Sequence, residues 1–291
     1  MLCTYFNKKY IHNGLAWLRS VRRTLGPVPV IVLALDDNTS YFFKSLNDPA
    51  LSILAHQELL DYAPGLSDVL AKRTQLSWAA SYKPPLCKYI LDKYGVVEYF
   101  DADCWFVSDL KPVSEEVKST AVSIVPHRFS PTCPAFLSQF GVYNAGYVYF
   151  NKNNGQDAEK ACEDWYDYCL NWKSVRSGET FWDQGVLNEW PEKYKAHIVQ
   201  NPGANLAPWN QDQYTYSTKG ENLLVNNLPV IWYHFHQHKV QCQEHVMAAS
   251  RGVYKLHPVV VEKIYQPYEQ ELLNCLNMIA GYFKRPIEEL Y

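Results

Sequence analysis

The N-terminal segment alternates between continuous apolar runs and a periodic amphipathic stretch. Residues 2–6 (LCTYF) read as a first strand, and residues 28–35 (VPVIVLAL) form a continuous apolar run, which is typical of a strand buried on both faces. Between them, apolar side chains recur at helical spacing over residues 14–25, and we expect a helix there, capped by Asn13 and stopped at Gly26. Strand, helix and strand in this order predict a βαβ unit and therefore a parallel sheet.

The same alternation continues further along the chain. Residues 67–80 and 83–94 have helical patterns, and the second opens with two prolines and closes at Gly95. The apolar run VVEYF over residues 96–100 then predicts another buried strand, and the sequence DAD follows it directly. Ligands of open α/β sheets bind at the carboxyl ends of the strands, so these aspartates are expected at a ligand site.

The remaining pattern completes an α/β fold. We expect a mostly parallel sheet with helices on both faces and a C-terminal helical extension, with no repeat, low-complexity segment or linker. The further elements that we expect are strands at 117–127, 141–151 and 228–239, an amphipathic helix at 158–172, a short capped helix within 177–190 and a terminal helix at 269–283.

Composition and charge narrow the function classes. The chain has 291 residues, of which 47% are hydrophobic and 20% charged, as in an ordinary globular protein of one large domain or one domain with an elaborated end. Its net charge of −3 gives no electrostatic reason to expect nucleic acid as a partner. The 22 tyrosines and 9 tryptophans can stack on sugars or bases, but most are expected in the core.

Cysteine usage and the N-terminal residues bear on location. None of the eight cysteines forms a C-x-x-C pair, so we expect mostly free thiols in a reducing compartment. The start MLCTYFNKKY does not resemble a signal peptide, and no apolar run approaches the ~20 residues of a spanning helix. We therefore expect a cytoplasmic protein, with peripheral membrane contact left open and no prediction of its oligomeric state.

The sequence DAD offers the strongest candidate chemistry. In an extended chain, Asp101 and Asp103 would point the same way and present two carboxylates to one place. A hard divalent cation would relieve their repulsion, and it could also neutralise a leaving diphosphate. The ordinary alternative is a solvated turn or a helix cap. The pattern is common by chance, and its position after a buried strand is what favours a cation site.

The histidine cluster HFHQH, residues 234–238, has three interpretations. One histidine could join the aspartates at a single ion, all three could form a separate zinc site, or all could be surface residues. We favour a single metal-proximal residue, His234, because three ligands on successive pleats of one strand span a wide row.

Three further motifs carry polar groups. Asp183 and Gln184 in FWDQG could supply a general base or a sugar contact, but a helix cap is the better interpretation from the sequence alone. Gly146 in YNAGYVYF predicts either close approach of a ligand or backbone, or a bulge. The loop NPGANLAPWN, residues 201–210, could hold a sugar or be purely structural. P-loop, dinucleotide-binding and α/β-hydrolase signatures are absent from the sequence.

The order of these pieces resembles the GT-A glycosyltransferases, in a bacterial-type branch of the nucleotide-diphospho-sugar transferases. The segments that carry the resemblance are SYKPPLCKYIL, VEYFDADCWFVSDL, SIVPHRFS, GVYNAGYVYFN, FWDQGVLNEWP and NPGANLAPWN. They lie between about residues 80 and 210, and the opening βαβ unit fits as well. The resemblance implies a GT-A-like catalytic domain over residues 1–240, followed by a helical extension over residues 241–291.

The resemblance also implies roles for individual residues. Asp101, Asp103 and His234 would hold Mn²⁺ or Mg²⁺, although the glycine and KPW that follow this histidine in one related family are absent. The residues expected to contact the nucleotide sugar are Thr4, Tyr5, Lys83, Asp101, Ala102, Asn144, Ala145 and Gly146, and those expected at the reacting sugar are Asp183 and Gln184.

The function that the resemblance implies is metal-dependent transfer of a sugar from a nucleotide-diphosphate sugar, UDP being favoured, to a hydroxyl of a carbohydrate or glycoconjugate acceptor. The motifs slightly favour an enzyme that retains the anomeric configuration of the transferred sugar. The alternatives are a sugar nucleotidyltransferase, for which the segment FNKKYIHNG has too few glycines, and a non-catalytic carbohydrate-binding protein, which would have no use for paired carboxylates after a buried strand.

Overall fold

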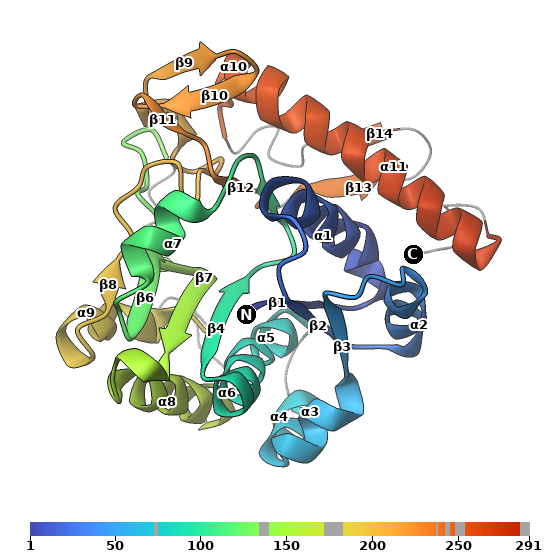
Figure 1. Ribbon diagram of the computed structural model, residues 1–291, viewed down its shortest axis with the longest axis vertical. Coiled ribbons are helices and arrows are strands. Elements are labelled where there is room, and N and C mark those ends of the chain that lie inside the picture. The colour runs from blue at the N-terminus through green and yellow to red at the C-terminus, as the bar shows by residue number, and fades with distance from the viewer. Residues whose placement is uncertain are drawn as a thin grey trace.

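A twisted mixed sheet forms the centre of the molecule (Figure 1). The computed structural model describes residues 1–72, 75–133, 140–171, 183–236, 238–241, 245–247 and 254–285. Within these residues the sheet has seven strands, in the order β3-β2-β1-β4-β7-β6-β8. Only β7 runs antiparallel to its neighbours β4 and β6. The strands are β1 (Leu2–Phe6), β2 (Val30–Ala34), β3 (Leu51–Ala55), β4 (Val96–Phe100), β6 (Val122–Pro126), β7 (Tyr143–Asn151) and β8 (His197–Ile198).

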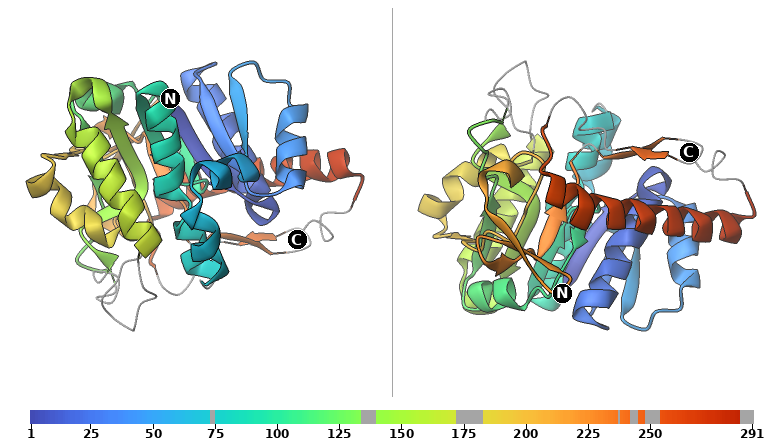
Figure 2. Two further views of the ribbon diagram at one scale, coloured as in Figure 1. Left: turned by 90° about the horizontal axis from the view of Figure 1, so that it is seen from below. Right: turned by 90° about the horizontal axis from the view of Figure 1, so that it is seen from above.

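Helices cover both faces of this sheet, as the sequence pattern predicts (Figure 2). Along β2, Val30 and Val32 pack into one hydrophobic core, whereas Ile31 and Leu33 pack into the other. This alternation is the reason why the run is apolar at every position. The first core includes side chains of α1 (Ile11–Leu25), α2 (Asp37–Ser45), α7 (Lys111–Val117) and α11 (Gln266–Phe283), and the second includes α3 (His56–Tyr62), α4 (Gly65–Ala71), α6 (Lys83–Tyr94) and α8 (Asp157–Asn171).

The start of α1 differs from the prediction. Asn13 does not cap the helix; it lies inside it, is 3% exposed, and donates from Nδ2 to the hydroxyl of Tyr268 at 2.9 Å. The cap lies earlier, because Asn7 accepts from the backbone of Lys9 and caps a 3₁₀ turn, η1 (Lys8–Tyr10), that runs directly into α1. Because Asn7, which lies upstream, provides the cap, the helical segment begins earlier than the sequence pattern predicted.

The helix α6 places its N-terminus at the ligand edge of the sheet. Pro84 and Pro85 occupy its first turn, and Gly95 ends it with a left-handed φ of 79°, as predicted. The pattern predicted over residues 67–80 gives two short helices, α4 and α5 (Gln75–Ala80), and residues 73–74 between them lie outside the described part. Because α6 leads into the amino end of β4, its own first residue, Lys83, lies near the carboxyl end of the sheet.

The segment predicted as one strand over residues 228–239 is broken. It contains β11 (Leu228–Pro229), which joins β10 (Asn222–Val225) and β9 (Tyr216–Lys219), and then β12 (Trp232–His234), which pairs antiparallel with β5 (Cys104–Phe106). His234 lies opposite Cys104 in this pairing. The strand ends at His234, and the three histidines therefore do not form one row.

The C-terminal helix packs onto α1 and the hydrophobic core on one face of the sheet. Figure 1 shows α11 lying alongside α1, and Tyr268, Leu272 and Ile279 enter the same core as the sheet. It follows α10 (Pro258–Val260) and a π-helical turn, η6 (Val261–Tyr265), and before these the chain forms a hairpin of β13 (Lys239–Gln241) and β14 (His245–Met247). A helical extension is thus present, and the domain boundary at residue 240 stays a prediction. Over the described residues, no helix has the length and apolarity to cross a membrane.

Candidate active site

The DAD segment forms a turn, and not the extended chain that the sequence argument assumed. The backbone N–H of Cys104 donates to the carbonyl of Asp101 at 3.0 Å, closing a tight turn between β4 and β5. The two carboxylates nevertheless approach one imidazole. Nε2 of His234 lies 3.3 Å from Oδ1 of Asp103 and 3.8 Å from Oδ2 of Asp101. The turn thus places both acids at the carboxyl end of β4, where they meet His234 of β12.

Gly146 explains how His234 reaches this place. A Cβ atom at this position would lie 2.5 Å from Cε1 of His234 and 2.6 Å from Oδ1 of Asn144, so no larger residue fits without a shift. Gly146 also lies where the register between β6 and β7 shifts, so the bulge that the sequence left as one alternative occurs. The group that approaches Gly146 closely is the side chain of His234, and the approach of a ligand stays a prediction. The ring is held from its other side, since Nδ1 lies 3.3 Å from Oδ1 of Asn205.

Lys83 connects the acidic turn with Asp183. Its Nζ lies 3.0 Å from Oδ1 of Asp101, 2.9 Å from Oδ2 of Asp183 and 3.3 Å from the carbonyl oxygen of Ala145. Burial alone would lower the pKa of this lysine, but the charges of Asp101 and Asp183 outweigh it and raise the pKa well above the ordinary value. Lys83 is therefore a fixed positive charge inside the site.

Asp183 does not cap a helix. The turn that follows, η4 (Gly185–Glu189), has Gln184 at its cap position with no side-chain cap, while the Asp183 side chain faces Lys83 and the residue is 5% exposed. Burial raises the pKa of Asp183, and Lys83 opposes this shift. The capping interpretation favoured from the sequence alone is therefore wrong. The part of the predicted short helix that covers residues 177–182 lies outside the described residues.

Gln184 and Asn144 form a second layer of polar contacts. Oε1 of Gln184 accepts from the backbone N–H of Ala145 at 3.2 Å, and its Nε2 donates to the carbonyl of Phe140 at 3.0 Å. Asn144 accepts from the N–H of Gly146 at 3.1 Å, and its Nδ2 lies 3.2 Å from Nε2 of His127. The predicted residues on β7 and those at positions 183–184 are therefore one connected cluster beside Lys83.

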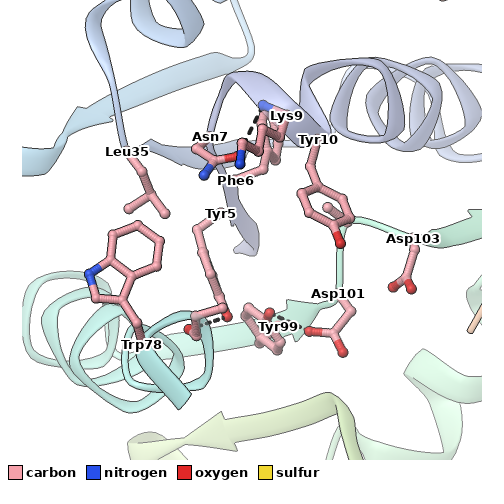
Figure 3. Close-up of a pocket in the computed structure, with 12 residues that line it drawn as sticks. Tyr5, Phe6, Asn7, Lys9, Tyr10, Leu35, Trp78, Tyr99, Asp101 and Asp103 are labelled. Carbon is pink, nitrogen blue, oxygen red and sulfur yellow. Dashed lines mark hydrogen bonds between the residues drawn. The ribbon is translucent and has the colours of Figure 1, made fainter. Parts of the chain in front are cut away.

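A cavity of about 390 Å³ opens next to this cluster (Figure 3). Aromatic side chains line one part of it, and Asp101, Ala102 and Asp103 line the other. In Figure 3 the cavity extends from the ring of Trp78 to the carboxylate of Asp103. Tyr5 lies between these ends and donates its hydroxyl to the carbonyl of Ala79 at 2.7 Å. Thr4 is fully buried in β1 and is not among the described lining residues.

The acidic turn fits a hard divalent cation. The donor atoms of Asp103, Cys104 and His234 lie within 4.8 Å of one another. Burial, followed by the charges of the two aspartates, raises the pKa of Cys104 well above its usual range, so it stays a thiol. Carboxylate oxygens suit Mn²⁺ or Mg²⁺, and an imidazole beside them favours the transition metal Mn²⁺, whereas a protonated thiol suits neither ion. Asp101, Asp103 and His234 are thus the better ligand set.

The other two histidines of the cluster lie elsewhere. The ring of His236 lies 5.5 Å from that of Trp209, and Nε2 of His238 lies 3.5 Å from Oε1 of Glu269. Among the described residues, the group of side chains that could hold a metal ion contains only one histidine of the cluster, His234, so the separate three-histidine zinc site is not formed. His234 lies where the single-ion interpretation requires it, and its role as a ligand stays a prediction.

The loop of residues 201–210 packs against the ring of His234. Asn205 is fully buried against His234, and the ring of Trp209 meets that histidine edge to face at 5.2 Å. Asn210 donates to the carbonyls of His127 and Asn205 at 2.8 and 3.0 Å. These contacts make the loop a structural support for His234, while the sugar-holding alternative stays open.

Several residues at the site were not predicted from the sequence. They are Asn7, Lys9, Tyr10, Trp78 and Tyr99 in the cavity and His127 beside Asn144. Asn7 follows β1 and His127 follows β6, so the rule that ligands bind after the carboxyl ends of strands could have found both. Trp78 and Tyr99 carried no such signal, because aromatic residues are common throughout this chain.

Comparisons with known proteins agree with this architecture. No protein-family model matches the chain. It is 24% identical over 288 residues to the uncharacterized protein YfnD of Bacillus subtilis (strain 168), covering 96% of this chain and 91% of YfnD. It is 26% identical over 253 residues to the uncharacterized protein YfnF of the same strain, covering 82% of this chain and 81% of YfnF.

Solved structures give the fold. The galactosyltransferase LgtC, crystallised with donor and acceptor sugar analogs, superposes with a TM-score of 0.54 at 13% identity, covering 94% of this chain and 95% of LgtC. This chain has the GT-A glycosyltransferase fold. The apo form of the glycosyltransferase GlyE from Streptococcus pneumoniae TIGR4 gives a TM-score of 0.54 at 13% identity, covering 97% of this chain and 62% of GlyE. In the GT-A fold of this chain, the acidic turn and the cavity occupy the carboxyl edge of the sheet.

Proposed function

We propose that this protein is a metal-dependent glycosyltransferase that moves a sugar from a UDP-sugar to a hydroxyl of a carbohydrate or glycoconjugate acceptor. The observation that carries the proposal is the meeting of Asp101, Asp103 and His234 beside a cavity lined by aromatic rings, at the carboxyl edge of a GT-A sheet. The GT-A fold is consistent with it, since LgtC is named as a galactosyltransferase and GlyE as a glycosyltransferase.

The nucleotide would occupy the aromatic part of the cavity. Tyr5 and Trp78 offer ring faces to a base, and the acidic turn at the other end would face the diphosphate through the cation. The cavity volume of about 390 Å³ is in the range of sites that bury a small ligand.

The residues of the chain then divide the work of the reaction. A bound Mn²⁺ or Mg²⁺ would neutralise the charge of the diphosphate as it leaves. Lys83 holds the carboxylates of Asp101 and Asp183 in place, because its Nζ lies 3.0 Å from the first and 2.9 Å from the second. Gln184 fixes the backbone of Ala145 next to the expected position of the donor sugar. These side chains would therefore mainly bind and orient the nucleotide sugar, and would not transfer protons.

We also propose that the anomeric configuration is retained. An inverting enzyme needs a base that takes the proton of the acceptor, but Oδ2 of Asp183 is paired with Lys83 and the side chain is buried. A buried carboxylate in this place instead stabilises positive charge that develops on the donor sugar. The ¹H NMR spectrum of the first product formed distinguishes the two outcomes, and an inverted anomer would contradict retention.

The experiment that tests the function is a panel of nucleotide sugars with and without Mn²⁺. We expect slow hydrolysis of at least one UDP-sugar, together with a rise in melting temperature when UDP and Mn²⁺ are both present. GDP-, CMP- and ADP-sugars serve as controls for the base. If no nucleotide sugar is hydrolysed and none raises the melting temperature, the proposal is wrong.

A further inference from the structure

The imidazole of His234 contacts an amide on the side opposite to the two acids. Its Nδ1 lies 3.3 Å from Oδ1 of Asn205, and its Nε2 lies 3.3 Å from Oδ1 of Asp103. A neutral imidazole carries one ring proton, and only the nitrogen without that proton has a lone pair for a cation. The hydrogen bond at Nδ1 therefore decides whether Nε2 can act as a ligand.

The backbone fixes the position of Asn205 relative to this ring. Leu206, which follows it, donates its N–H to the carbonyl of Trp232 at 3.2 Å, and the N–H of His234 donates to the carbonyl of Leu206 at 2.8 Å. Asn205 has a left-handed φ of 60°, a conformation that asparagine adopts more readily than most residues. The loop is thus paired with β12, and the amide of Asn205 meets the imidazole.

Only one end of the Asn205 side chain is satisfied in the part of the chain that the structure describes. The residue is fully buried, and its Nδ2 has no hydrogen-bond partner among the described residues. A buried donor without an acceptor is costly, and a purely structural asparagine would pair both ends of its amide. The contact between Oδ1 and His234 is therefore the interaction that explains an amide at this position.

The amide oxygen selects one tautomer of the histidine. An amide oxygen accepts hydrogen bonds and cannot donate them, so Oδ1 of Asn205 requires the proton of His234 on Nδ1. The lone pair of Nε2 is then free on the side where Asp103 lies. The opposite tautomer would place two acceptors, Nδ1 and Oδ1, against each other and direct an N–H towards Asp103 instead of a lone pair.

We propose that Asn205 is a positioning residue for the cation: its amide oxygen keeps the proton of His234 on Nδ1, so that Nε2 can join the two aspartates as a ligand. The inference rests on the proposed function and deepens its metal site. Asn205 acts through His234, and it gives the loop of residues 201–210 a chemical role in addition to its packing against the ring.

Two substitutions at this position test the role of the acceptor, by calorimetric titration of Mn²⁺ in the presence of UDP. Asn205→Gly tolerates the left-handed backbone but removes the acceptor, and the Kd for Mn²⁺ should rise about 10- to 100-fold. Asn205→Asp keeps an acceptor oxygen and should bind Mn²⁺ at least as tightly as the wild type. Asn227→Gly is the matched control, because Asn227 is exposed with a φ of 67°, and it should leave the Kd unchanged.

A second measurement reports the tautomer itself, which a packing role alone would not change. Protonated and unprotonated ring nitrogens have well-separated ¹⁵N chemical shifts, so NMR of protein with its nine histidines labelled distinguishes them. With UDP and the diamagnetic ion Mg²⁺ bound, the signals that are lost in His234→Ala should show the proton on Nδ1. In Asn205→Gly the proton should no longer be confined to that nitrogen.

The outcomes separate this inference from the function on which it rests. A proton on Nε2 in the loaded wild type, or an unchanged Kd in Asn205→Gly, would overturn the role of Asn205 and leave the glycosyltransferase proposal standing. Equal weakening in Asn205→Asp and Asn205→Gly would show that the residue acts through packing, which also overturns the inference. If Mn²⁺ binds as expected but no nucleotide sugar is hydrolysed, the proposed function fails and the role of Asn205 at the cation stands. If the wild type binds no Mn²⁺, the inference and the metal dependence fail together.

Discussion

Nζ of Lys83 lies 2.9 Å from Oδ2 of Asp183, and this ion pair joins the start of helix α6 to the turn before η4. The Lys83 and Asp183 side chains are only 11% and 7% exposed. Removal of one partner from such a site leaves the other charge buried with fewer partners. The loss of unfolding free energy should therefore exceed that caused by removing one partner of a surface ion pair.

Asp183→Asn should therefore reduce sugar transfer strongly. We expect turnover to fall about 100-fold or more, because a preorganised charge is lost where charge develops in the reaction. Binding of UDP with Mn²⁺, measured by calorimetry, should persist, since the nucleotide cavity is not lined by this residue. The matched control is Asp164→Asn, which removes an exposed partner of Lys193 and should change neither quantity. Unchanged turnover in Asp183→Asn would remove Asp183 from the reaction.

Asp103→Ala should abolish turnover of the nucleotide sugar while the protein stays folded. The expected cause is loss of a metal ligand, because Asp103 is the acid nearest to Nε2 of His234. The measurement is the Mn²⁺-dependent rise in melting temperature, with turnover followed in parallel with and without EDTA. Cys104→Ser is the control: it should keep the Mn²⁺ response if the sulfur is no ligand. Full activity of Asp103→Ala in EDTA would contradict the metal assignment.

Gly146→Ala should displace His234. A Cβ atom 2.5 Å from the imidazole cannot be accommodated without movement, and overpacking of this kind costs about 1–3 kcal/mol in unfolding free energy. Misplacement of a ligand should also weaken Mn²⁺ binding by about 10- to 100-fold, measurable by titration. Gly281→Ala in α11 is the matched control, because a Cβ there meets nothing within 4 Å and the helix should gain slightly. Equal Mn²⁺ affinity in both variants would show that His234 tolerates the shift or binds no metal.

Glu98 on β4 should make stability depend on pH. Burial raises the pKa of this residue from its ordinary value of 4.5 to about 7, although Tyr147 donates a hydrogen bond to it at 3.1 Å. The folded state favours the protonated acid, so its contribution is fully present below pH 4.5 and is lost as the pH rises through 7. The difference is about 3 kcal/mol in unfolding free energy.

Urea unfolding of the wild type and of Glu98→Gln at pH 4.5, 6 and 8 checks this prediction. The two proteins should have similar unfolding free energies at pH 4.5, and the variant should be the more stable one at pH 8. A wild type whose stability relative to the variant does not fall between these values would show that Glu98 ionises freely in the folded protein.

The strands near the site followed from the sequence, whereas their order in the sheet and the contacts between side chains did not. The apolar runs at β1, β2 and β4 predicted buried parallel strands, and the acidic pair at the end of β4 predicted a ligand site. The local reasoning for that pair was wrong, because the chain turns at Asp101 where an extended strand was assumed. The acids reach His234 through tertiary contacts, among them the pairing of β5 with β12, which no local pattern records.

Asp183 is a second residue whose contacts the local sequence did not predict. Its position before a short helix favoured a cap, and only the resemblance to GT-A enzymes suggested the site. The structure gives it a long-range partner, Lys83, that outweighs the local preference. Asn13 was also assigned as a cap, although it contacts Tyr268 in the last helix. Both errors arise because polar side chains satisfy either local or distant groups, and the sequence alone does not distinguish them.

The position of His234 late in the chain sets when the site can be complete during biosynthesis. A ribosome that has synthesised β4 and β5 has already delivered Asp101 and Asp103, but their imidazole partner, His234, follows more than a hundred residues later. The helix α11, whose Tyr268 stacks on Phe235 at 3.7 Å, comes later still. A nascent chain therefore carries the acids of the site well before it can organise them, and activity should begin only after nearly all of the described fold has been synthesised.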